Sequence, residues 1–455
     1  MTISRFIFRD GHLAQLRQLL FDQPGIEGAA FVLCGEAHTA GLQKLISHAV
    51  VPIADEDYLV REPLRLSIGS RALARITKLA RYENLSILFA HSHPGGSCEF
   101  SEQDDGEEDR LLPFLQARLP GRLHGTVVLT ESEITGRIYG PDRKKVETIW
   151  SIGTRIRLLR SILAASIPEF FDRQIRAFGK ENQTLLRSLH VGVVGVGGTG
   201  SAVAEQLYRL GIGSLVLFDG DRLDKTNLNR VYGARLDDVG QYKVEIAKRH
   251  LDEIGLSTTV EAVSEHITWE ETARRLTECD VLFGCTDKQI PRAILVQLSI
   301  RYAIPVFDLG VLLESVHGQL KGVHGRVTTL LPGEACLICR ERISAEAMRL
   351  EALSDADRQS QISDGYAPEL AEPAPAVIPF TSAVASFAVS ELLHRITGFM
   401  GPERHSTELL VNFDQSKVRT NRVSSAENCL CSTESLFGRG DEIPLLGMVW
   451  PTRTM

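Results

Sequence analysis

The sequence predicts an α/β protein of two domains, the second of which is built on a mostly parallel β-sheet. At 455 residues the chain is too long for one ordinary hydrophobic core. From Leu189 onward, short apolar runs alternate with helical stretches, a pattern typical of parallel strands covered by helices on both faces. With 43% hydrophobic and 24% charged residues, the composition is that of a globular protein rather than of a disordered chain.

The first domain is predicted to span residues 1–148 and to be a small α/β unit. Its expected elements are one helix, HLAQLRQLL (12–20), and four strands, AAFVLC (29–34), LSILFAHSH (85–93), GTVVLT (125–130) and ITGRIYG (134–140). An Arg-rich segment from about Val146 to Phe178 is expected to be helical. We therefore interpret residues 149–182 as a helical connector.

The second domain is predicted to span residues 183–437, with residues 438–455 as a C-terminal tail. Its first strands are expected at HVGVVGVG (190–197), SLVLFD (214–219), DVLFGC (280–285) and IPVFDL (304–309). The acidic stretch from Ile343 to Pro375, which contains AEPAPA, is interpreted as a long loop with a helical piece. A buried helix and a strand at ELLVNFD (408–414) are expected after it.

Charge and composition exclude several classes of protein. A net charge of −8 argues against nucleic acid as the main partner. The longest apolar stretches are interrupted by Pro, Ser and Thr, so no membrane span is expected, and the N-terminus lacks the pattern of a secretory signal. We therefore expect a cytoplasmic protein, in which the eight cysteines do not form a disulfide framework.

Two histidines separated by one residue stand at the end of an expected strand, in the segment HSHPGGSCEFSEQDD (91–105). Their side chains project to the same side of the strand and can share a metal ion. Asp104 can supply an oxygen ligand, which leaves a fourth position open for water, as in a catalytic zinc site. Pro94, Gly95 and Gly96 allow the sharp turn that brings Asp104 back to the histidines.

This segment resembles the JAMM/MPN metalloprotease family, whose signature is His-x-His-Pro, six residues, Ser, two residues and Asp. His91, His93, Pro94, Ser101 and Asp104 stand at that spacing. The resemblance implies an N-terminal JAMM/MPN α/β domain in which His91, His93 and Asp104 hold a zinc ion and Ser101 helps to stabilise the oxyanion. It also implies cleavage of a peptide or isopeptide bond after the C-terminus of a ubiquitin-like protein.

The same resemblance implies a glutamate upstream that acts as general base. Glu27 precedes the run GAAFVLCG and Glu36 follows it. The family places this glutamate at the start of a strand that ends in glycine, which favours Glu27 with Gly35 as the closing glycine. The spacing from Glu27 to Gly35 is one residue longer than the family pattern, so Glu36 stays open as the alternative.

A glycine-rich turn follows the first strand of the second domain, in LHVGVVGVGGTGSAVAEQLYRLGIGSLVLFDGD (189–221). Strand, turn, helix and second strand in this order indicate a Rossmann-like unit. Its glycines let the backbone approach phosphate groups, and the helix N-terminus adds a positive dipole. They are Gly195, Gly197, Gly198 and Gly200. Asp219 is placed to hold ribose hydroxyls, and a nicotinamide-dependent dehydrogenase would fit this segment equally well.

The residues downstream favour ATP over a nicotinamide cofactor. The run DGDRLDKTNLNRVYG (219–233), Lys243 and the GCTD segment ending at Asp287 add charged groups that hydride transfer does not need. A triphosphate with Mg²⁺ does need them, because Arg and Lys neutralise the leaving diphosphate and a carboxylate holds the metal.

Residues from roughly Phe171 to Cys431 resemble the adenylation domain shared by ubiquitin-activating enzymes and ThiF/MoeB-type adenylyltransferases. The resemblance implies that ATP and Mg²⁺ bind here, with Asp219 on the ribose, Asp287 on the magnesium, and Asn227, Arg230 and Lys243 on the phosphates. It also implies that the C-terminal carboxylate of a bound ubiquitin-like or sulfur-carrier protein with a β-grasp fold attacks the α-phosphate. The product would be an acyl-adenylate.

Upstream of this region, DRQIRAFG (172–179) resembles the Arg-Gln motif of the same family. The resemblance implies that Arg173 reaches the ATP of a neighbouring protomer and therefore that the protein is a homodimer.

Four of the eight cysteines form two tight pairs. They are Cys336 and Cys339, in Cys-x-x-Cys, and Cys429 and Cys431, in Cys-x-Cys. Two such pairs suit a structural zinc with four thiolate ligands. The adenylation family has a zinc of this kind, usually with two Cys-x-x-Cys pairs, and the Cys-x-Cys pair departs from that pattern. Two pairs of buried thiols are the alternative.

The chain has no cysteine from Arg340 to Asn428. Thioester-forming members of the adenylation family carry their cysteine in the loop that corresponds to part of this stretch. Thr381 and Ser382 lie in the same stretch but match helix-start residues of the family. We therefore predict adenylation without a stable thioester on this chain.

These features together predict a bifunctional enzyme of a bacterial ubiquitin-like pathway. One half activates the C-terminus of a carrier, and the other half matures the carrier or removes it from targets, with a conjugating enzyme as a further partner. Sulfur-carrier activation for cofactor synthesis or thio-modification is the nearest alternative. A nicotinamide-dependent oxidoreductase, or a regulatory module with an inactive hydrolase site, are further alternatives.

Overall fold

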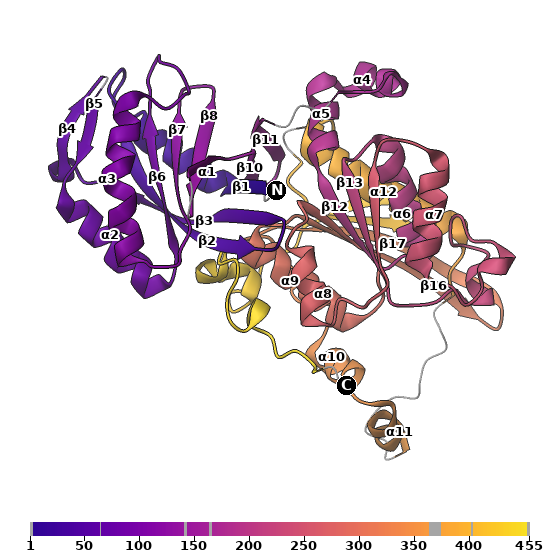
Figure 1. Cartoon of the computed structure of the whole chain (residues 1–455). Coiled ribbons are helices and arrows are strands. Elements are labelled where there is room, and N and C mark those ends of the chain that lie inside the picture. The colour runs from indigo at the N-terminus through magenta and orange to yellow at the C-terminus, as the bar shows by residue number, and fades with distance from the viewer. Residues whose placement is uncertain are drawn as a thin grey trace. The chain divides into compact units, whose positions relative to one another are not determined.

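The computed structural model describes residues 3–63, 65–140, 143–162, 166–363, 375–401 and 404–452. The chain divides into two compact units (Figure 1). Unit 1 comprises Met1–Ala164, Arg301–Ala303 and Ser435–Ile443, and unit 2 comprises Ala165–Ile300, Ile304–Glu434 and Pro444–Met455. The boundary near residue 164 lies later than the predicted end of the first domain at residue 148, and part of the predicted tail belongs to unit 1.

Unit 1 contains a nine-stranded mixed sheet in the order β11-β10-β1-β3-β2-β6-β7-β8-β9 and a separate β4–β5 hairpin. The elements of unit 1 are β1 (Ile3–Arg9), α1 (Asp10–Leu20), β2 (Ala29–His38), β3 (Leu42–Pro52), β4 (Tyr58–Glu62), β5 (Arg65–Ile68), α2 (Ser70–Glu83), β6 (Ser86–Ser92), α3 (Glu102–Arg118), β7 (His124–Leu129), β8 (Ile134–Tyr139), β9 (Arg143–Lys145), β10 (Thr148–Ile152) and β11 (Ile156–Ser161). The helix expected at 12–20 and the four strands expected in this domain are confirmed.

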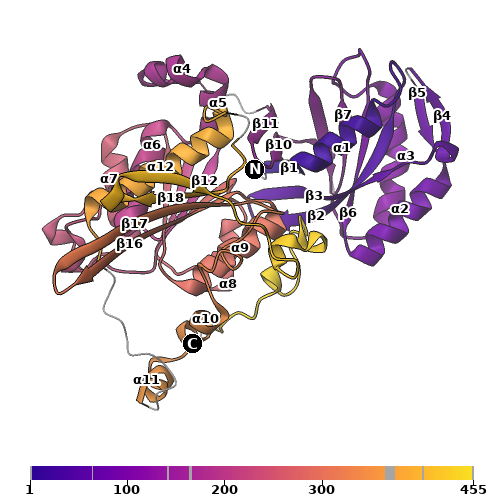
Figure 2. The same cartoon turned by 180° about the vertical axis from the view of Figure 1, so that it is seen from behind.

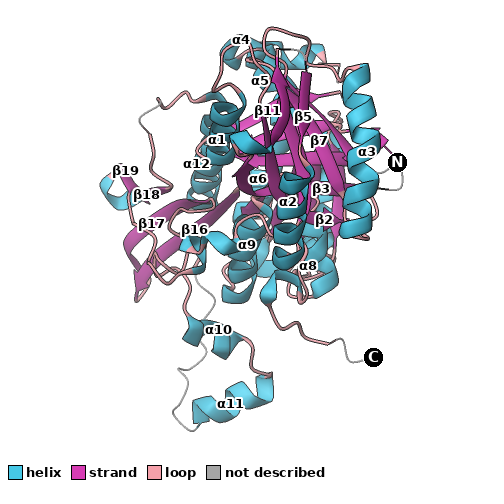
Figure 3. Cartoon of the chain, turned by 90° about the vertical axis from the view of Figure 1, so that its left-hand side faces the viewer, coloured by secondary structure: helices cyan, strands magenta, loops and turns pink. Residues whose placement is uncertain are grey.

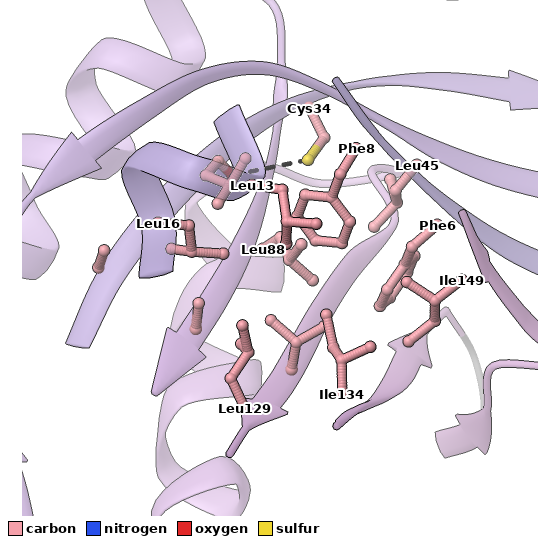
Figure 4. Packing of buried hydrophobic residues seen from close by; sticks show 14 of the residues in the cluster. Phe6, Phe8, Leu13, Leu16, Cys34, Leu45, Leu88, Leu129, Ile134 and Ile149 are labelled. Atoms are coloured by element: carbon pink, nitrogen blue, oxygen red, sulfur yellow. Dashed lines mark hydrogen bonds between the residues drawn. The ribbon is translucent and has the colours of Figure 1, made fainter. Parts of the chain in front are cut away.

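Both faces of the unit 1 sheet are buried. Because side chains alternate along a strand, Val32 of β2 joins the hydrophobic cluster on the α1 side, whereas Phe31 and Leu33 join the cluster on the α2 and α3 side. Figure 4 shows Leu13 and Leu16 of α1 packed within the first of these clusters. The sheet is thus covered by α1 on one face and by α2 and α3 on the other, as Figure 3 also shows.

The expectation of a helical connector from Val146 is wrong over its first part. Residues 148–152 form β10 and residues 156–161 form β11, and both strands belong to the unit 1 sheet. All five residues of β10 are buried, whereas a surface helix buries only one stripe of its side chains. β-Branched and aromatic residues such as Ile149 and Trp150 also favour a strand. Helical structure begins only at α4 (Asp172–Phe178).

Unit 2 contains an eight-stranded sheet in the order β14-β13-β12-β15-β16-β17-β18-β19. Its elements are α4, α5 (Lys180–Ser188), β12 (His190–Val194), α6 (Gly198–Leu210), β13 (Ser214–Phe218), α7 (Lys243–Ile254), β14 (Thr259–Val263), α8 (Glu270–Leu276), β15 (Val281–Gly284), α9 (Gln289–Tyr302), β16 (Val306–Val316), β17 (Gln319–Leu330), α10 (Ala345–Glu351), α11 (Asp355–Ser363), α12 (Ile378–Thr397), β18 (Glu408–Asn412) and β19 (Lys417–Asn421).

The first five strands of this sheet in spatial order are parallel, and the remaining three pair antiparallel. Helices α6, α7 and α12 lie on one face, and α8 and α9 lie on the other (Figures 1 and 2). The expected mixed α/β fold, with a parallel sheet covered on both faces, is confirmed for this unit. The buried helix and the strand expected after the acidic stretch are also confirmed, as α12 and β18.

The carboxyl ends of β12, β13 and β15 lie side by side. Val194, at the end of β12, pairs in register with Phe218 of β13 and with Gly284 of β15. Because parallel strands present their carboxyl ends at one edge of a sheet, the three loops that follow must meet there. This edge is the position at which ligands bind in open α/β sheets.

The acidic stretch from Ile343 to Pro375 contains the helices α10 and α11, so the helical piece expected there is confirmed. Residues 364–374, which include most of AEPAPA, lie outside the described residues. Among the helices that are described, none is both long and apolar enough to cross a bilayer.

Candidate functional site

In unit 1, β6 and α3 bring two histidines and one carboxylate together. His91 lies near the end of β6, His93 follows that strand, and Asp104 lies in the first turn of α3. The Nε2 atom of His91 is 3.2 Å from Nε2 of His93 and 2.9 Å from Oδ1 of Asp104. The Nε2 atom of His93 is 3.4 Å from Oδ2 of Asp104. The three residues predicted as metal ligands therefore converge on one point.

The spacing of these atoms fits a zinc ion. Ligands bound tetrahedrally at 2.0–2.1 Å from zinc lie about 3.3 Å from one another. The three measured separations scatter around that value, and the donor set of two imidazole nitrogens and one carboxylate oxygen is one that zinc accepts. No fourth protein ligand belongs to this cluster within the described part of the chain, so three ligands would leave a position for water.

Ser101 and Asp104 form a capping box at the start of α3. The Ser101 Oγ accepts a hydrogen bond from the Asp104 amide at 3.2 Å, and the Ser101 amide donates to Asp104 Oδ2 at 2.6 Å. Burial alone would raise the pKa of Asp104, but hydrogen bonds with His91 and His93 outweigh it and hold this pKa below its usual range. The helix cap thus holds the carboxylate in place, and the two histidines favour its ionised form.

The pairing of β2 with β6 decides which glutamate faces this cluster. Ala29 of β2 pairs with His91 of β6 in an antiparallel register. Glu27, two residues before Ala29, therefore lies at the end of β2 that is next to the histidines. Burial raises the pKa of Glu27, and the charges of His91 and His93 oppose that rise. Glu36 lies towards the far end of β2, where it accepts hydrogen bonds from the Leu123 amide and from other donors of that region.

A partly buried ion network, which the sequence did not indicate, holds the helix that carries Asp104 against β8. Arg137 of β8 pairs with Asp105 at 2.5 Å and with Glu108 at 2.9 Å, both on α3. The Arg137 guanidinium also lies over the Phe100 ring, 3.9 Å from its centre, and that ring packs edge-on against His91 at 6.3 Å. Arg137 therefore contacts both the loop before α3 and the first turn of the helix that carries Asp104.

A cavity of about 330 Å³ opens beside the cluster. Glu27, His91, Ser101 and Asp104 line one part of it. The remainder is lined mainly by apolar side chains from β5, α2, β6 and α3, namely Leu66, Ile68, Leu73, Phe89, Leu111 and Phe114. The sequence did not single out this apolar wall, because its members are ordinary strand and helix residues until the fold brings them together.

In unit 2, the glycine-rich turn and Asp219 meet at the carboxyl edge of the sheet. Asp219 directly follows β13, and its Oδ2 accepts a hydrogen bond from the Val196 amide of the turn at 2.7 Å. Its Oδ1 accepts from the Asp221 amide at 2.8 Å. Burial raises the pKa of Asp219, and the nearby Lys243 ammonium opposes that rise. Each carboxylate oxygen has a second lone pair, so both remain able to accept from a ribose hydroxyl.

Two of the predicted phosphate-binding cations lie at the same edge. Arg230 lies against the glycine turn, since a Cβ built on Gly198 would meet its Cγ at 3.1 Å. Lys243, the first residue of α7, pairs with Asp221 at 2.9 Å. Asn227 stands in the same loop as Arg230, and its side-chain oxygen accepts a hydrogen bond from the Asp224 amide at 3.3 Å. Asp221 belongs to the quoted DGD segment, but only the structure shows that it holds Lys243.

The loop after β15 brings Asp287 to this edge. Its backbone closes on the glycine turn, because the Cys285 amide donates to the Val194 carbonyl at 2.8 Å. Asp287 itself is exposed. Behind it, Arg292 of α9 is 3.3 Å from the buried Asp308, and the Asp287 charge also acts on Arg292. Arg292 is a cation near the predicted magnesium ligand that the sequence did not indicate.

Arg292 also lines a second cavity, of about 510 Å³, on the antiparallel side of the unit 2 sheet. Its other basic side chains are Arg326, Arg342, Arg419 and His324. Asp308 compensates part of this positive charge, since it pairs with Arg326 at 2.6 Å as well as with Arg292. The cavity therefore presents a basic surface close to Asp287.

The structure does not bring Arg173 to this edge of its own unit. Arg173 is exposed on the short helix α4. The sequence predicted that it reaches the nucleotide of a second protomer, and this stays a prediction.

Gly200 is needed for the shape of the glycine-rich turn. A Cβ at this position would lie 1.8 Å from the Gly195 carbonyl oxygen, whereas a Cβ at Gly197 meets no atom within 4 Å. We expect Gly200→Ala to lower the free energy of unfolding by about 1–3 kcal/mol, because the backbone must shift to admit the methyl group. Calorimetric unfolding of both variants would measure this, and equal midpoints for Gly200→Ala and the control Gly197→Ala would contradict it.

The four paired cysteines converge in unit 2. The Sγ atoms of Cys336 and Cys429 are 3.5 Å apart, as are those of Cys339 and Cys431, and those of Cys336 and Cys339 are 4.0 Å apart. Sulfur ligands bound tetrahedrally at 2.3 Å from zinc lie about 3.8 Å from one another. A hydrogen bond from Cys431 lowers the pKa of Cys336, against the effect of burial. The Cys-x-Cys pair thus fits a four-thiolate zinc site despite its shorter spacing.

Loss of one of these thiols should remove a structural metal. We expect Cys336→Ser to lower the zinc content by one equivalent and the unfolding midpoint by about 5–10 °C, since each 1 kcal/mol lost shifts it by roughly 2–4 °C in units of this size. Zinc would be measured by atomic emission and unfolding by calorimetry. Cys279→Ala, which removes a buried thiol outside the cluster, should keep the zinc. Unchanged zinc in Cys336→Ser would contradict the assignment.

Several curated proteins are similar to a part of the chain. Protein HesA of Leptolyngbya boryana is 32% identical over 174 residues, which cover 38% of this chain and 60% of that protein. Ubiquitin-like modifier-activating enzyme 5 of Oryza sativa subsp. japonica is 31% identical over 173 residues, 35% of this chain and 39% of that protein. tRNA threonylcarbamoyladenosine dehydratase of Bacillus subtilis (strain 168) is 43% identical over 102 residues, 22% of this chain and 40% of that protein. The chain thus spans less than two thirds of the length of these relatives.

Among solved structures, E. coli MccB with ATP has a TM-score of 0.45 and 19% identity, and the match covers 58% of this chain and 74% of that one. A comparison with protein families matches residues 171–433, more than half of the chain, to the ThiF family. The chain therefore belongs to the ThiF family.

Proposed function

We propose that the chain is a bifunctional enzyme that adenylates the C-terminal carboxylate of a ubiquitin-like or sulfur-carrier protein and hydrolyses the peptide or isopeptide bond that follows such a C-terminus. The observation that supports the first activity most directly is the meeting of the glycine turn, Asp219, Arg230, Lys243 and Asp287 at one edge of a parallel sheet in a member of the ThiF family.

In the adenylation reaction, the chain aligns two reactants and stabilises charge. A carboxylate oxygen of the carrier attacks the α-phosphorus of ATP, the bond from that phosphorus to the bridging oxygen breaks, and diphosphate leaves. The proposed roles are ribose binding for Asp219, neutralisation of the phosphates by Arg230 and Lys243 with Asn227 as a polar contact, and magnesium binding for Asp287. The basic cavity beside Arg292 supports this assignment, because it attracts an anionic carrier tail towards Asp287.

We propose that the acyl-adenylate passes directly to an acceptor. Thr381 and Ser382 lie in the first turns of α12, as expected from the resemblance. The Thr381 Oγ1 donates to the Ile378 carbonyl at 3.0 Å, and the Ser382 Oγ lies 2.9 Å from the Tyr232 hydroxyl. Both hydroxyls thus have a hydrogen-bond partner in unit 2. Detection by mass spectrometry of a covalent carrier–enzyme adduct that is cleaved by added thiols would contradict this proposal.

The hydrolase activity is proposed for the cluster in unit 1. His91, His93 and Asp104 would hold a zinc ion, which when bound acidifies a water molecule and polarises the scissile carbonyl. Glu27, buried beside the cluster with a raised pKa, is suited to accept a proton from the attacking water and pass it to the leaving amine. Ser101 lines the same cavity and can donate to the oxyanion. The convergence of the three ligand atoms supports this proposal.

The partners that follow are a β-grasp carrier, a second copy of this chain that receives Arg173, and a conjugating enzyme or a sulfur-transfer protein downstream. Conjugation and sulfur transfer share the adenylation step and differ in the acceptor. A nicotinamide-dependent oxidoreductase is the further alternative. It predicts an absorbance change with NAD(P)H and no exchange of diphosphate into ATP.

Carrier-dependent ATP–diphosphate exchange tests the adenylation proposal. The substrates are small β-grasp proteins with a free C-terminal carboxylate, and the control for each is the same protein without its last two residues. Exchange is expected only with the intact C-terminus, because the carboxylate is the nucleophile. The absence of exchange with every such carrier, in protein that binds ATP, would contradict the proposal.

A further inference from the structure

The cavity beside the candidate hydrolase cluster has one polar part and one apolar part. The polar part carries the four residues expected to act on the scissile bond. The apolar part is a pocket lined by the six side chains named above, and we call it the apolar pocket. It begins at Phe89, whose ring lies 5.7 Å from the His91 ring, so the two parts are continuous.

The apolar pocket is held in place by the core of unit 1. Ile68, Leu73, Phe89, Leu111 and Phe114 are only partly buried, yet all five pack against the hydrophobic cluster between the sheet and the helices α2 and α3. Partly buried apolar side chains that share one concave surface are typical of a binding pocket, because burying their remaining exposed area under a ligand is favourable.

The rim of the cavity is polar. Gln103, Glu107 and Arg110 follow the exposed side of α3 and line the cavity as well. A polar rim around an apolar interior orients a ligand with its polar backbone outside and an apolar side chain inside. A polypeptide with a large apolar residue has this distribution of polar and apolar groups.

We propose that the apolar pocket is a specificity pocket, which receives one large apolar side chain, such as Leu, Met or Phe, of a residue that flanks the scissile bond. This inference rests on the proposed hydrolase function. The volume agrees with it, since an apolar cavity of about 150 Å³ already binds benzene and this cavity measures about 330 Å³. A linear polypeptide with such a residue at the cleavage site would then be preferred over an isopeptide flanked only by glycine and a lysine chain.

A peptide library tests the proposal on the whole, zinc-loaded chain. The probe is a mixture of carrier C-terminal peptides in which the residues on both sides of the expected cleavage point are varied, and mass spectrometry identifies the products. At one of these two positions, Leu, Met or Phe should be cleaved about ten- to a hundredfold faster than Gly, the gain expected from burying one such side chain.

Two variants on α2 form a matched pair. Leu73 lines the pocket, whereas Leu79 on the same helix is exposed and does not. Leu73→Trp should fill the pocket and shift the preference towards Gly and Ala, while Leu79→Trp should leave the wild-type preference unchanged. Cleavage without an apolar preference at either position, or the same preference in both variants, would overturn the inference alone.

A binding measurement separates the pocket from the chemistry. The probes are two peptides that differ only in Leu or Gly at the preferred position, titrated by calorimetry into the His93→Ala variant, which lacks one ligand of the unit 1 metal site. The Leu peptide should bind about tenfold more tightly or better. Equal affinities would overturn the pocket. No cleavage of any peptide or carrier by the zinc-loaded protein would overturn the proposed hydrolase function, and with it the substrate role of the pocket.

Discussion

Replacing Asp287 with asparagine is expected to lower carrier-dependent ATP–diphosphate exchange by about 100- to 1,000-fold, the effect of removing one group that stabilises transition-state charge. Asp287 follows β15 at the carboxyl edge of the sheet, close to the glycine turn and to Lys288. Because the Asp287 side chain is exposed, replacing it with asparagine should leave the free energy of unfolding almost unchanged. The loss would therefore reflect the chemistry of the site.

Exchange would be followed with labelled diphosphate at saturating ATP and carrier. Asp252→Asn is the matched control, because Asp252 is an exposed carboxylate of unit 2 on α7, in an ion pair with Lys248. The second internal control is zinc content, which the substitution should not alter. If exchange by Asp287→Asn stayed within a factor of about three of the wild type, a change of about 0.7 kcal/mol in activation free energy, the proposed magnesium role would be excluded.

The sequence predicted the parts of both sites that lie within short segments. The glycine turn is specified by residues five or fewer positions apart, and the His91–Asp104 motif spans one strand end and one helix start. Fixed local geometry, namely the strand period of two and the helix cap, then places the side chains with little freedom. These are the features for which sequence and structure agree.

What the sequence did not reveal depends on contacts between distant segments. Whether Glu27 or Glu36 faces the histidines is set by the pairing of Ala29 with His91, and spacing along one chain does not fix that register. Arg137 contacts Phe100 and Asp105 of α3 only because the fold places β8 next to that segment. The apolar pocket is assembled from four separate elements.

The strand β10 was mistaken for a helix for a related reason. Its residues carry no alternation of apolar and polar side chains, because both faces of that strand are buried in the unit 1 sheet. The Arg-rich residues that follow β10 were then included in the same expected helix. A short buried run cannot be assigned from periodicity alone, so its partner strands β1 and β11 are what identify it.

Asp104→Ala should separate the two proposed activities most clearly. Without this carboxylate, His91 and His93 lose both a metal ligand and the negative charge that lies 2.9 Å and 3.4 Å from their Nε2 atoms. We expect zinc content to fall from two equivalents to one, since the four-cysteine cluster is independent. Hydrolysis of a carrier precursor should fall by about 1,000-fold or more, or roughly 4 kcal/mol of activation free energy.

The same variant should keep full ATP–diphosphate exchange, because the residues proposed for adenylation all belong to unit 2. Asp109→Ala provides the control on the same helix, since Asp109 is exposed and pairs only with Arg143 among the ion pairs of the described residues. Precursor cleavage would be measured by mass spectrometry and metal by atomic emission. If Asp104→Ala retained both zinc equivalents and hydrolysis, Asp104 would not be a metal ligand, and its contacts with His91 and His93 would be hydrogen bonds of the fold.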